Sequence, residues 1–496
     1  MIGLRGLRFD VDECVPPVAE LGRVHVLAVG GAGMSAVARL VKAAGLPVSG
    51  SDAKASALLT VLAAEGVPVV VGHDPEQVRD VDTVVFSSAI REDNPELARA
   101  RRDGRRVLHR AQALTAVMQG RTVLAVAGAN GKTTTTSMLV ELLLGAGMDP
   151  GYAIGGELTG RGTNAALGGG SSFVVEADES DGSFLVYRPQ VAVVTNVQAD
   201  HLDFYGTFEA VRAAYRAFAD TIAPQGLLVA CADDPGSADL ADYQRGRGGR
   251  VLTYGTDPGA DVVIAEPVLQ GLTAGAVLRA AGSAGSAGSA DVALGLEVPG
   301  LHNLRNATGA YLAATAGLGV SPEAARAGLT GFSGVRRRFE ARGHAGGVRV
   351  VDDYAHNPAK VAAVVSTAAG LIGDGRLVAV FQPHLYSRTR DFADAFGQAL
   401  AAADVVVVLP VYAAREDPVP GVTGALVARA ALAAGAPSVV DLSEAPSGEA
   451  GALAEIAERV AALTRPGDLV VTIGAGDVTE VGPLLLEALE RPQRRG

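Results

Sequence analysis

A glycine-rich segment that follows an apolar run constrains the fold of this chain more than any other feature. Val123-Leu-Ala-Val126 predicts a buried strand, and Gly128-Ala-Asn-Gly-Lys-Thr-Thr134 follows it almost directly. The segment is a shortened relative of the phosphate loop, with Val126 where the usual pattern has glycine. Backbone N–H groups would cradle phosphates, Lys132 would reach the terminal phosphates, and the Thr133 hydroxyl can bind Mg²⁺. The sequence therefore predicts a strand, a phosphate-binding turn and a helix in succession.

The same alternation of strand and helix runs along nearly the whole chain. Apolar, β-branched runs alternate with alanine-rich stretches, which is typical of a parallel sheet covered by helices. Two further glycine-rich turns mark further units, Gly30-Gly-Ala-Gly33 and Gly474-Ala-Gly476. A chain of 496 residues is long enough for about three domains. We therefore expect an α/β protein with domains at residues 1–118, 119–333 and 334–496.

The first glycine turn has the sequence context of a dinucleotide-binding fingerprint. Gly31-Ala-Gly33-Met-Ser-Ala36 fits G-x-G-x-x-(G/A), follows the apolar run Val24–Val29, and is followed by Asp52 about 20 residues further on. Glycines let the backbone approach a diphosphate, the helix start offers N–H groups, and the acid can bind sugar hydroxyls. The pattern predicts a diphosphate site and leaves NAD(P), FAD and a UDP-sugar open as ligands.

Carboxylates and one histidine follow the strands next to the phosphate loop. Ser172-Phe-Val-Val-Glu176 predicts a strand ending in a carboxylate, the usual second ligand of a loop-bound Mg²⁺. His201 follows the next strand and is a candidate for metal or phosphate binding. We interpret the acids after Glu176 as solvated turn residues: Asp178, Glu179 and Asp181. Two anion sites on separate domains exclude a simple dehydrogenase and indicate ATP acting on a nucleotide-linked substrate.

Composition excludes several other classes of protein. Forty-two basic against 54 acidic residues give a net charge of −12, which argues against nucleic acid as the main partner. Two cysteines, Cys14 and Cys231, cannot build a disulfide framework, and Cys231 ends an apolar run typical of a core position. No long apolar stretch suggests a membrane span, and acids occupy the N-terminal segment where a signal peptide would be apolar. We expect a cytoplasmic protein.

One segment has a different composition. Residues 279–291 are a Gly/Ser/Ala repeat between strand-like stretches around Val262–Ile264 and Val292–Leu294. We interpret the segment as the elongated tip of a hairpin.

These segments together resemble the Mur ligase family, the ATP-dependent amide-forming enzymes of peptidoglycan synthesis. The resemblance covers essentially the whole chain. It is most specific for the branch that joins L-alanine to UDP-N-acetylmuramate, in Gly33-Met-Ser35, Glu176-Ala-Asp-Glu-Ser-Asp181 and Gln382-Pro-His384 with Arg388-Thr389. The chain departs from that branch at Asn130, where His is usual.

The resemblance implies a Rossmann-like N-terminal domain that holds UDP, a P-loop-type central ATPase domain, and a Rossmann-like C-terminal domain that closes over ATP and the amino acid. The residues that it implies for ATP are Gly128, Ala129, Asn130, Gly131, Lys132, Thr133, Thr134, His302, Asn303, Asn306 and Arg337. Those for the other substrates are Gly31, Ala32, Gly33, Met34, Ser35, Asp52, Ser87, Ser88, Tyr354, His384 and Arg388. Those for Mg²⁺ or Mn²⁺ are Thr133, Glu176 and His201, and the catalytic residues are Lys132, Glu176, His201, His356 and Arg388.

The implied chemistry activates a carboxylate with ATP. The lactyl carboxylate of UDP-N-acetylmuramate would attack the γ-phosphate, and the amine of L-alanine would attack the resulting acyl phosphate. Lys132 and Mg²⁺ would screen the meeting of two anions. Arg388 suits an α-carboxylate because a guanidinium pairs with it bidentately, and His356 is a candidate base for the amine. We expect a monomer or a weak homodimer.

Three alternatives stay open from the sequence. A recycling ligase would add a whole tripeptide to the same sugar nucleotide. A nicotinamide-dependent oxidoreductase would use the first glycine turn with Asp52. A non-catalytic homologue would bind the UDP-sugar alone, and only Asn130 favours it.

Overall fold

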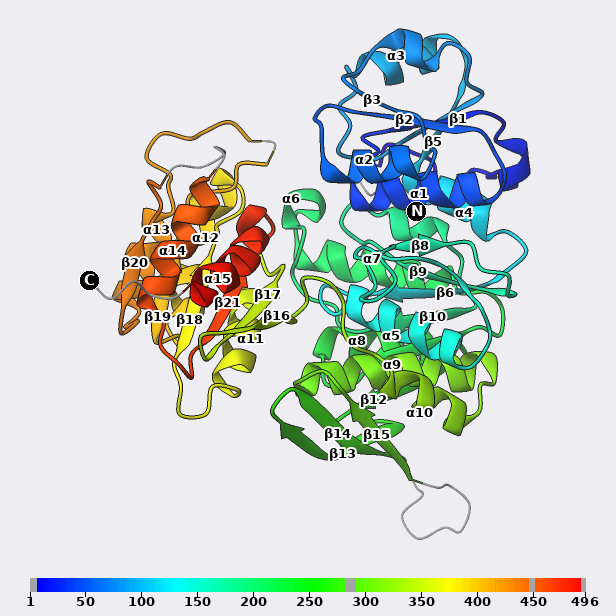
Figure 1. Ribbon diagram of the computed structural model, residues 1–496. Coiled ribbons are helices and arrows are strands. Elements are labelled where there is room, and N and C mark those ends of the chain that lie inside the picture. Colours follow the sequence, from blue (N-terminus) through cyan, green and yellow to red (C-terminus); the bar gives the residue numbers. More distant parts are fainter. Residues whose placement is uncertain (1–6, 282–290, 415, 446–450, 492–496) are drawn as a thin grey trace. The chain divides into compact units, whose positions relative to one another are not determined.

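The structure is a computed structural model that describes residues 7–281, 291–414, 416–445 and 451–491. These residues form three sheets, each with helices packed on it, which confirms the predicted α/β class with three such parts. The chain divides into two compact units, with the boundary along the sequence between Ser333 and Gly334. The first unit holds two of the sheets and the second unit holds the third (Figure 1).

The first sheet is a doubly wound parallel sheet. Its strands pair in parallel in the order β3 (Val69–Val71), β2 (Val48–Asp52), β1 (Val24–Leu27), β4 (Thr83–Phe86) and β5 (Arg106–His109). From β1 the chain adds β2 and β3 on one side and then β4 and β5 on the other. The strand order therefore reverses between β1 and β4, where a crevice for ligands forms in such folds. The helical elements are η1 (Val18–Glu20), α1 (Ala32–Ala43), α2 (Ala57–Ala64), η2 (Pro75–Val78), α3 (Pro95–Arg102) and α4 (Arg110–Met118).

The second sheet has ten strands, and its first strand in the sequence leads into the phosphate loop. Their order is β15 (Val292–Leu296), β14 (Thr273–Ala280), β13 (Val262–Gln270), β12 (Arg250–Gly255), β11 (Leu227–Cys231), β10 (Val191–Val194), β6 (Thr122–Ala127), β9 (Ser172–Glu176), β7 (Gly151–Ala153) and β8 (Ala165–Ala166). The strands from β13 to β7 in this order pair in parallel, and the apolar strand β11 buries Cys231 as predicted. The helical elements are α5 (Lys132–Gly145), η3 (Ser183–Val186), α6 (Leu202–Tyr205), α7 (Phe208–Asp220), α8 (Pro235–Gly246), α9 (Leu301–Leu318) and α10 (Pro322–Thr330).

The hairpin beside the Gly/Ser/Ala repeat differs from the predicted one. The repeat connects β14 to β15, and these two strands pair antiparallel, whereas the sequence suggested Val262–Ile264 as the first strand. That stretch belongs to β13, which forms its own antiparallel pair with β14. Strand β14 was missed because its alanine and glycine residues lower its β-propensity. Of the predicted tip, residues 279–291, positions 282–290 lie outside the described residues.

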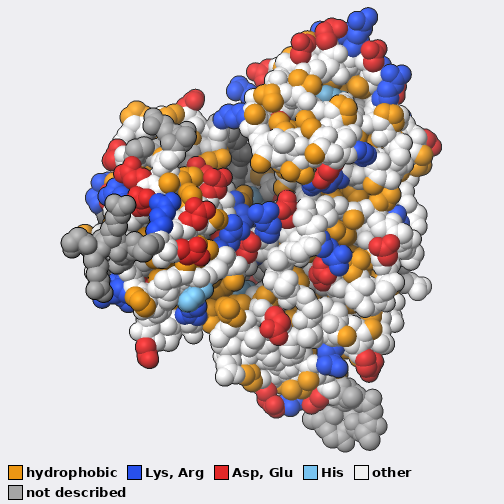
Figure 2. All heavy atoms as spheres, in the orientation of Figure 1, with side chains coloured by type: hydrophobic (Ala, Val, Ile, Leu, Met, Phe, Trp, Pro, Cys, Tyr) orange, Lys and Arg blue, Asp and Glu red, His pale blue; other side chains and the backbone are white. Residues whose placement is uncertain are grey.

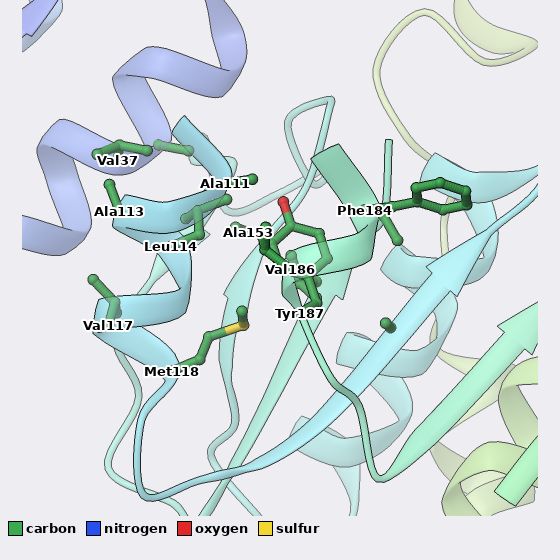
Figure 3. Close-up of a cluster of buried hydrophobic side chains, with 14 of the residues drawn as sticks. Val37, Ala111, Ala113, Leu114, Val117, Met118, Ala153, Phe184, Val186 and Tyr187 are labelled. Carbon is green, nitrogen blue, oxygen red and sulfur yellow. The ribbon is translucent and has the colours of Figure 1, made fainter. Parts of the chain in front are cut away.

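One hydrophobic core joins the first two sheets. Val37 of α1 and Leu114 and Val117 of α4 belong to the same buried cluster as Val186 and Tyr187, which lie in and after η3. Figure 3 shows the side chains of α1 and α4 on one side of this cluster and those of η3 on the other. Because the burial of apolar surface is the main stabilising term in folding, this core holds the two sheets together as one unit.

The third sheet forms the second unit. Its order is β16 (Glu340–Ala345), β17 (Val348–Asp353), β21 (Leu469–Ile473), β18 (Leu377–Phe381), β19 (Val405–Val408) and β20 (Val439–Asp441), and all strands pair in parallel except β16 with β17. The helical elements are α11 (Pro358–Ala369), α12 (Tyr386–Leu400), α13 (Ala425–Ala433), α14 (Ala452–Leu463), η4 (Asp477–Glu480) and α15 (Val481–Glu490). Apolar side chains cover both faces of the central strands in two clusters.

Several helices begin with the same local signal. A side chain with an oxygen acceptor caps the helix, and proline occupies its first position, where no N–H is needed. The capping residues of α3, α8, α10 and α11 are Asn94, Asp234, Ser321 and Asn357.

Charges on the surface near α3 are paired. Arg99 and Arg101 contact the carboxylates of Asp103, Glu76 and Glu92, and Figure 2 shows basic and acidic side chains interspersed at the top of the view. Among the residues that the structure describes, no helix combines the length and hydropathy needed to cross a bilayer.

Candidate active site

The phosphate loop connects β6 to the first residue of α5. Gly128 and Gly131 have φ angles of 139° and 84°, which side-chain-bearing residues rarely adopt. A Cβ atom at Gly128 would lie 2.0 Å from Thr195 Oγ1, and one at Gly131 would lie 2.6 Å from Asn306 Oδ1. Glycine is therefore required at both positions, and α5 starts at Lys132 with its first N–H groups at the loop, as an anion site needs.

Lys132 is held at the loop by two acceptors. Its Nζ donates to Glu179 Oε1 at 2.8 Å and to the Gly128 carbonyl at 2.5 Å. Burial alone would lower the pKa of Lys132, but the carboxylates of Glu179 and Asp178 outweigh it and raise the pKa above its ordinary value. The side chain is therefore a fixed positive charge beside the loop.

Glu179 contradicts its predicted place in a solvated turn. The residue is only 2% exposed, and its Oε2 atom is buried with no hydrogen-bond partner among the described residues. Burial raises the pKa of Glu179, although Lys132 opposes the rise. A run of acids is normally solvated, but here Lys132 compensates the buried carboxylate. Asp178 pairs with Arg110, and Asp181 accepts the Ser88 hydroxyl and lies 3.5 Å from His109 Nε2, so neither is simply solvated.

A threonine and a glutamate next to the loop form a pair of oxygen ligands. Thr133 Oγ1 lies 3.0 Å from Glu176 Oε1, and Glu176 Oε2 accepts the N–H of Gly155 at 2.7 Å. His201 lies beside a different carboxylate, with Nε2 3.8 Å from Glu179 Oε1 and 4.0 Å from Asp200 Oδ2. The structure thus joins two of the three predicted metal ligands directly and places the third next to the Lys132 ion pair.

Asn130 is tied to the segment that follows β10. Its N–H donates to Asn196 Oδ1 at 2.9 Å, and its carbonyl accepts from Thr195 Oγ1 at 2.6 Å and Asn196 Nδ2 at 2.9 Å. Its side-chain amide donates to Gln198 Oε1 at 3.0 Å, and Gln198 in turn donates to Asp234 at 3.0 Å. Asn130 therefore fits the loop as part of a hydrogen-bonded chain. Sequence reasoning assigned no role to Asn196 or Gln198.

The predicted adenine-side residues lie in the first turns of α9. The side-chain amide of Asn303 donates to the Pro299 carbonyl at 2.8 Å, and Asn306 Nδ2 lies 3.4 Å from Asn303 Oδ1. Because Asn306 lies against Gly131, the start of α9 borders the phosphate loop. His302 is exposed at the same helix end. The structure thus places Asn306 beside the loop, with His302 and Asn303 in the turn of α9 before it.

The first glycine turn connects β1 to α1 and contacts the end of β2. Asp52, at the end of β2, accepts the N–H of Gly30 at 2.9 Å, and Gly31 precedes the first residue of α1. Asn164 of the second sheet's layer donates to the Ala32 carbonyl at 2.7 Å. Met34 and Ser35 are buried in the first turn of α1 and so position its N–H groups rather than expose their side chains.

Arg110 connects this turn with the acidic run and was missed by sequence reasoning. Its Nη2 donates to Asp178 Oδ2 at 3.0 Å, and a Cβ atom at Gly33 would lie 2.7 Å from its Nη1. Burial would lower the pKa of Arg110, but Asp178 and Asp181 outweigh it and raise the pKa. The position of Arg110 after strand β5, at the same sheet edge as the glycine turn, was the available signal.

Ser88 also reaches the acidic run. Its hydroxyl donates to Asp181 Oδ2 at 2.7 Å and lies 3.1 Å from His109 Nε2. Burial opposes the ionised form of Asp181, but the hydrogen bond from His109 holds the pKa of this carboxyl below its ordinary value. Ser87, the adjacent predicted residue, is half-buried at the end of β4. The first glycine turn is therefore linked to the acidic run through the partly buried Arg110–Asp178 pair, and Ser88 adds a hydrogen bond to Asp181.

In the second unit, Arg337 occupies the third glycine turn. Its Nη2 donates to the carbonyls of Gly474 at 2.7 Å and Gly476 at 2.9 Å, and its guanidinium lies 4.9 Å from the centre of the Tyr354 ring. The carbonyl groups of this turn accept hydrogen bonds from the Arg337 guanidinium, so the turn binds a cation in this structure and not an anion.

His356, His384 and Arg388 lie together in the second unit. Arg388 Nη1 is 3.2 Å from His384 Nδ1 and 3.3 Å from the His356 carbonyl, and the two imidazole rings are 5.9 Å apart. Burial, with the nearby charges of Lys360 and Arg388, lowers the pKa of His356 to about 3. His356 is therefore neutral near pH 7 and a weak base. For a reaction at this place, the positive field of the nearby charges is a better-supported influence than proton removal by His356 as a strong general base.

Comparisons with known proteins agree with this arrangement. Family models match consecutive parts of the chain: "Mur ligase family, catalytic domain" over residues 23–122, "Mur ligase middle domain" over 126–314, and "Mur ligase, glutamate ligase domain" over 337–476. The chain is 55% identical over 479 residues to the UDP-N-acetylmuramate–L-alanine ligase of Kineococcus radiotolerans, covering 96% of this chain and 98% of that protein.

Solved structures show the same fold. The UDP-N-acetylmuramate-alanine ligase MurC from Thermotoga maritima has a TM-score of 0.77 and 27% identity, over 94% of this chain and 98% of that one. The murein peptide ligase mpl from Psychrobacter arcticus has a TM-score of 0.69 and 26% identity, over 95% of this chain and 99% of that one. Sequence and fold together show that the chain belongs to the Mur ligase family.

Proposed function

We propose that this protein is an ATP-dependent ligase that joins L-alanine to the lactyl carboxylate of UDP-N-acetylmuramate in peptidoglycan biosynthesis, giving ADP and phosphate. The observation that supports this most directly is the adjacency of two anion sites in one unit. Arg110 lies between Gly33 of the diphosphate turn and Asp178, one residue from the Glu179 that pairs with Lys132. Relatives that are named UDP-N-acetylmuramate–L-alanine ligase match this chain over nearly its whole length.

ATP would bind at the phosphate loop. The loop and the start of α5 would hold its phosphates through backbone N–H groups, and Lys132 would exchange its contact with Glu179 for the terminal phosphates. The phosphate-binding residues of this proposal are Gly128, Ala129, Asn130, Gly131, Thr133 and Thr134, and the adenine-side residues are His302, Asn303 and Asn306. Arg337 would supply a further positive charge to the phosphates.

The donor set next to the loop fits Mg²⁺ or Mn²⁺. Mg²⁺ usually takes one or two carboxylates, with waters and substrate phosphates as the remaining ligands. The Thr133 hydroxyl and the Glu176 carboxylate supply two hard oxygen ligands, and His201 lies beside the neighbouring Glu179. Among the described residues no three histidine, cysteine or acidic side chains form a metal cage, which agrees with an ion that is completed by ATP and water. When bound, the ion would neutralise charge on the phosphates.

The reaction would proceed through an acyl phosphate. A carboxylate oxygen of the sugar nucleotide attacks the γ-phosphorus and ADP leaves; the amine of L-alanine then attacks the acyl carbon and phosphate leaves with that oxygen. Lys132 stabilises the negative charge that develops at the γ-phosphate. The diphosphate turn, with Asp52 on the ribose, holds the sugar nucleotide so that its carboxylate can reach this place.

The second unit would bind the amino acid. Arg388 can pair bidentately with the α-carboxylate of L-alanine, with His384 beside it. Tyr354 lies against the ring of His356 in the same group of residues. We propose functional domains at residues 1–118, 119–333 and 334–496, a cytoplasmic location, and a monomer or weak homodimer.

Phosphate release from ATP tests this proposal. Release that needs both UDP-N-acetylmuramate and L-alanine supports it. Release with a tripeptide acceptor but not with L-alanine would favour a recycling ligase, the second candidate, which the match to the Psychrobacter arcticus murein peptide ligase supports. Binding of UDP-N-acetylmuramate without any phosphate release would favour a non-catalytic homologue, and NAD(P)H-dependent absorbance changes would favour an oxidoreductase.

A further inference from the structure

The helix that carries Arg388 begins without a cap of its own. α12 starts at Tyr386, and the residue before it, Leu385, makes no side-chain hydrogen bond to the helix. Leucine is among the poorest residues at this position, because its side chain has no acceptor for the first N–H groups of a helix. The sequence at the helix start therefore leaves these groups to be satisfied from elsewhere in the chain.

Glu416, in the segment that follows β19, supplies this acceptor. Its Oε2 atom accepts the Ser387 N–H at 2.9 Å, and its Oε1 atom accepts the Ser387 hydroxyl at 2.5 Å. The two residues are 29 positions apart in the sequence, and both are half-buried. A carboxylate at a helix N-terminus makes charge-assisted hydrogen bonds and interacts favourably with the helix dipole. Glu416 is therefore a cap that reaches α12 from another element.

The same segment supports His384, which lies just before the helix. The Tyr412 N–H donates to the Pro383 carbonyl at 2.8 Å, and the Tyr412 carbonyl accepts the Leu385 N–H at 3.0 Å. The rings of Tyr412 and His384 are stacked, with their centres 6.0 Å apart and an angle of 17° between their planes. The segment after β19 thus holds both sides of the contact in which Arg388 Nη1 lies 3.2 Å from His384 Nδ1.

A kink separates the start of α12 from the rest of the helix. Phe392 has φ and ψ angles of −125° and 15°, outside the helical range, and it is 49% exposed. Because the kink interrupts the regular helix, the longer part of α12 does not by itself fix the direction of the turn that holds Arg388. That direction depends on contacts at the helix start, and the two hydrogen bonds to Glu416 come from outside the helix.

We propose that Glu416 is a positioning residue for the amino-acid substrate, which holds the first turn of α12 so that Arg388 meets the α-carboxylate of L-alanine in a bidentate geometry. The inference rests on the proposed function, which assigns Arg388 to that carboxylate. A bidentate pair needs two N–H groups in line with two oxygens, so a small rotation of the turn weakens it. Glu416 uses both of its oxygens for Ser387, which fits an action through the helix rather than direct contact with the substrate.

Steady-state kinetics of the full-length protein test the inference, with phosphate release as the readout. Glu416→Ala should raise the KM for L-alanine about ten-fold, a factor that corresponds to the loss of one charge-assisted hydrogen bond. The KM values for ATP and UDP-N-acetylmuramate, and kcat at saturating L-alanine, should stay within about two-fold, because only the binding of the amino acid is weakened. Glu416→Gln should restore most of the affinity for L-alanine, since the amide oxygen still accepts the Ser387 N–H.

Asp404→Ala is the matched control. Asp404 Oδ2 accepts the N–H of Leu377, 27 residues away, at 2.8 Å, so the variant removes a comparable hydrogen bond from the same unit. Leu377 begins β18, whereas α12 follows the end of that strand, so the control contact lies at the opposite edge of the sheet. The control should keep the KM for L-alanine of the unaltered protein. Thermal unfolding shows whether each variant is folded, and if Glu416→Ala is not, Glu416→Asp, which withdraws the carboxylate, decides by the same comparison of KM values.

Three results in the folded variant would overturn the inference: an unchanged KM for L-alanine, an equal rise in the KM values for all three substrates, or a loss of kcat without a change in KM. An equal rise in the KM for L-alanine in Asp404→Ala would also overturn it, because the effect would then be a general one on the unit. Failure of the proposed function looks different, since the unaltered protein itself would show no phosphate release that depends on L-alanine.

Discussion

Lys132 Nζ and Glu179 Oε1 form an ion pair of 2.8 Å in which the carboxylate is almost fully buried. The pair holds the positive charge of the Lys132 side chain beside the phosphate loop, where the γ-phosphate of ATP would lie.

Lys132→Ala should abolish turnover and leave the binding of the sugar nucleotide largely intact. The loss of one preorganised charge at the transition state costs about 10²–10³ in rate. Phosphate release and calorimetric titration with UDP-N-acetylmuramate measure the two effects. Lys42→Ala, on the far end of α1, is the control and should keep full turnover. Loss of both properties in Lys132→Ala would mean that the two anion sites have been interchanged.

Thr133→Val and Glu176→Gln should each raise the Mg²⁺ concentration needed for half-maximal turnover by about ten-fold or more, because each removes one hard oxygen ligand. A magnesium titration of phosphate release at saturating substrates measures the effect. Thr135→Val is a matched control, because its buried hydroxyl has no hydrogen-bond partner among the described residues. An unchanged magnesium requirement in both site variants would show that the ion binds elsewhere.

Arg110 and Asp178 should be coupled in the free energy of unfolding. Removal of either partner leaves a partly buried charge without its ion pair, and a double-mutant cycle of Arg110→Met with Asp178→Asn should give a coupling energy of about 1–2 kcal/mol. Denaturant unfolding of the four proteins provides the measurement. Additive effects would show that the ion pair does not link the diphosphate turn to the acidic run.

His356 should make the unfolding free energy of the protein sensitive to acid. Its folded pKa of about 3 lies below its ordinary value of 6.5, so the unfolded chain binds the proton more tightly. Its contribution to stability is complete above pH 6.5 and is lost as the pH falls from 6.5 towards 3. His356→Gln should remove this pH-dependent contribution. The difference in unfolding free energy between the variant and the unaltered protein should therefore change by about 1.4 kcal/mol per pH unit between pH 4 and 6.

Calorimetric unfolding of both proteins over this pH range gives the difference directly. His344→Gln, an exposed histidine in the same unit, is the matched control and should not change the slope. A difference between His356→Gln and the unaltered protein that is independent of pH would contradict the lowered pKa.

The strands and the first two glycine turns were predictable because their signals are local. The run Thr83–Phe86 and the strand before Glu176 occupy the predicted residues, and Gly128 and Gly131 have the backbone angles that the loop requires. Apolar, β-branched runs and glycines act on their own neighbours, so the sequence alone carries the information.

The partners of the acidic run could not be predicted in the same way. Arg110 and Asp178 are 68 residues apart, and Lys132 and Glu179 are 47 residues apart. Packing of the first sheet's layer on the second brings Arg110 to Asp178, and the pairing of β6 with β9 brings Lys132 to Glu179. Composition alone would place an acidic run in solvent. The third glycine turn shows the same limit, because Arg337, which donates to its carbonyls, lies 137 residues from Gly474 and could not be predicted as its partner.

The transfer of oxygen from the substrate carboxylate to phosphate tests the central claim most directly. UDP-N-acetylmuramate labelled with ¹⁸O in its lactyl carboxylate would be turned over with ATP and L-alanine, and the released phosphate analysed by mass spectrometry. Activation through an acyl phosphate predicts one ¹⁸O atom in each phosphate formed along with the amide product. Amide formation with unlabelled phosphate, or phosphate release without any amide, would contradict the account.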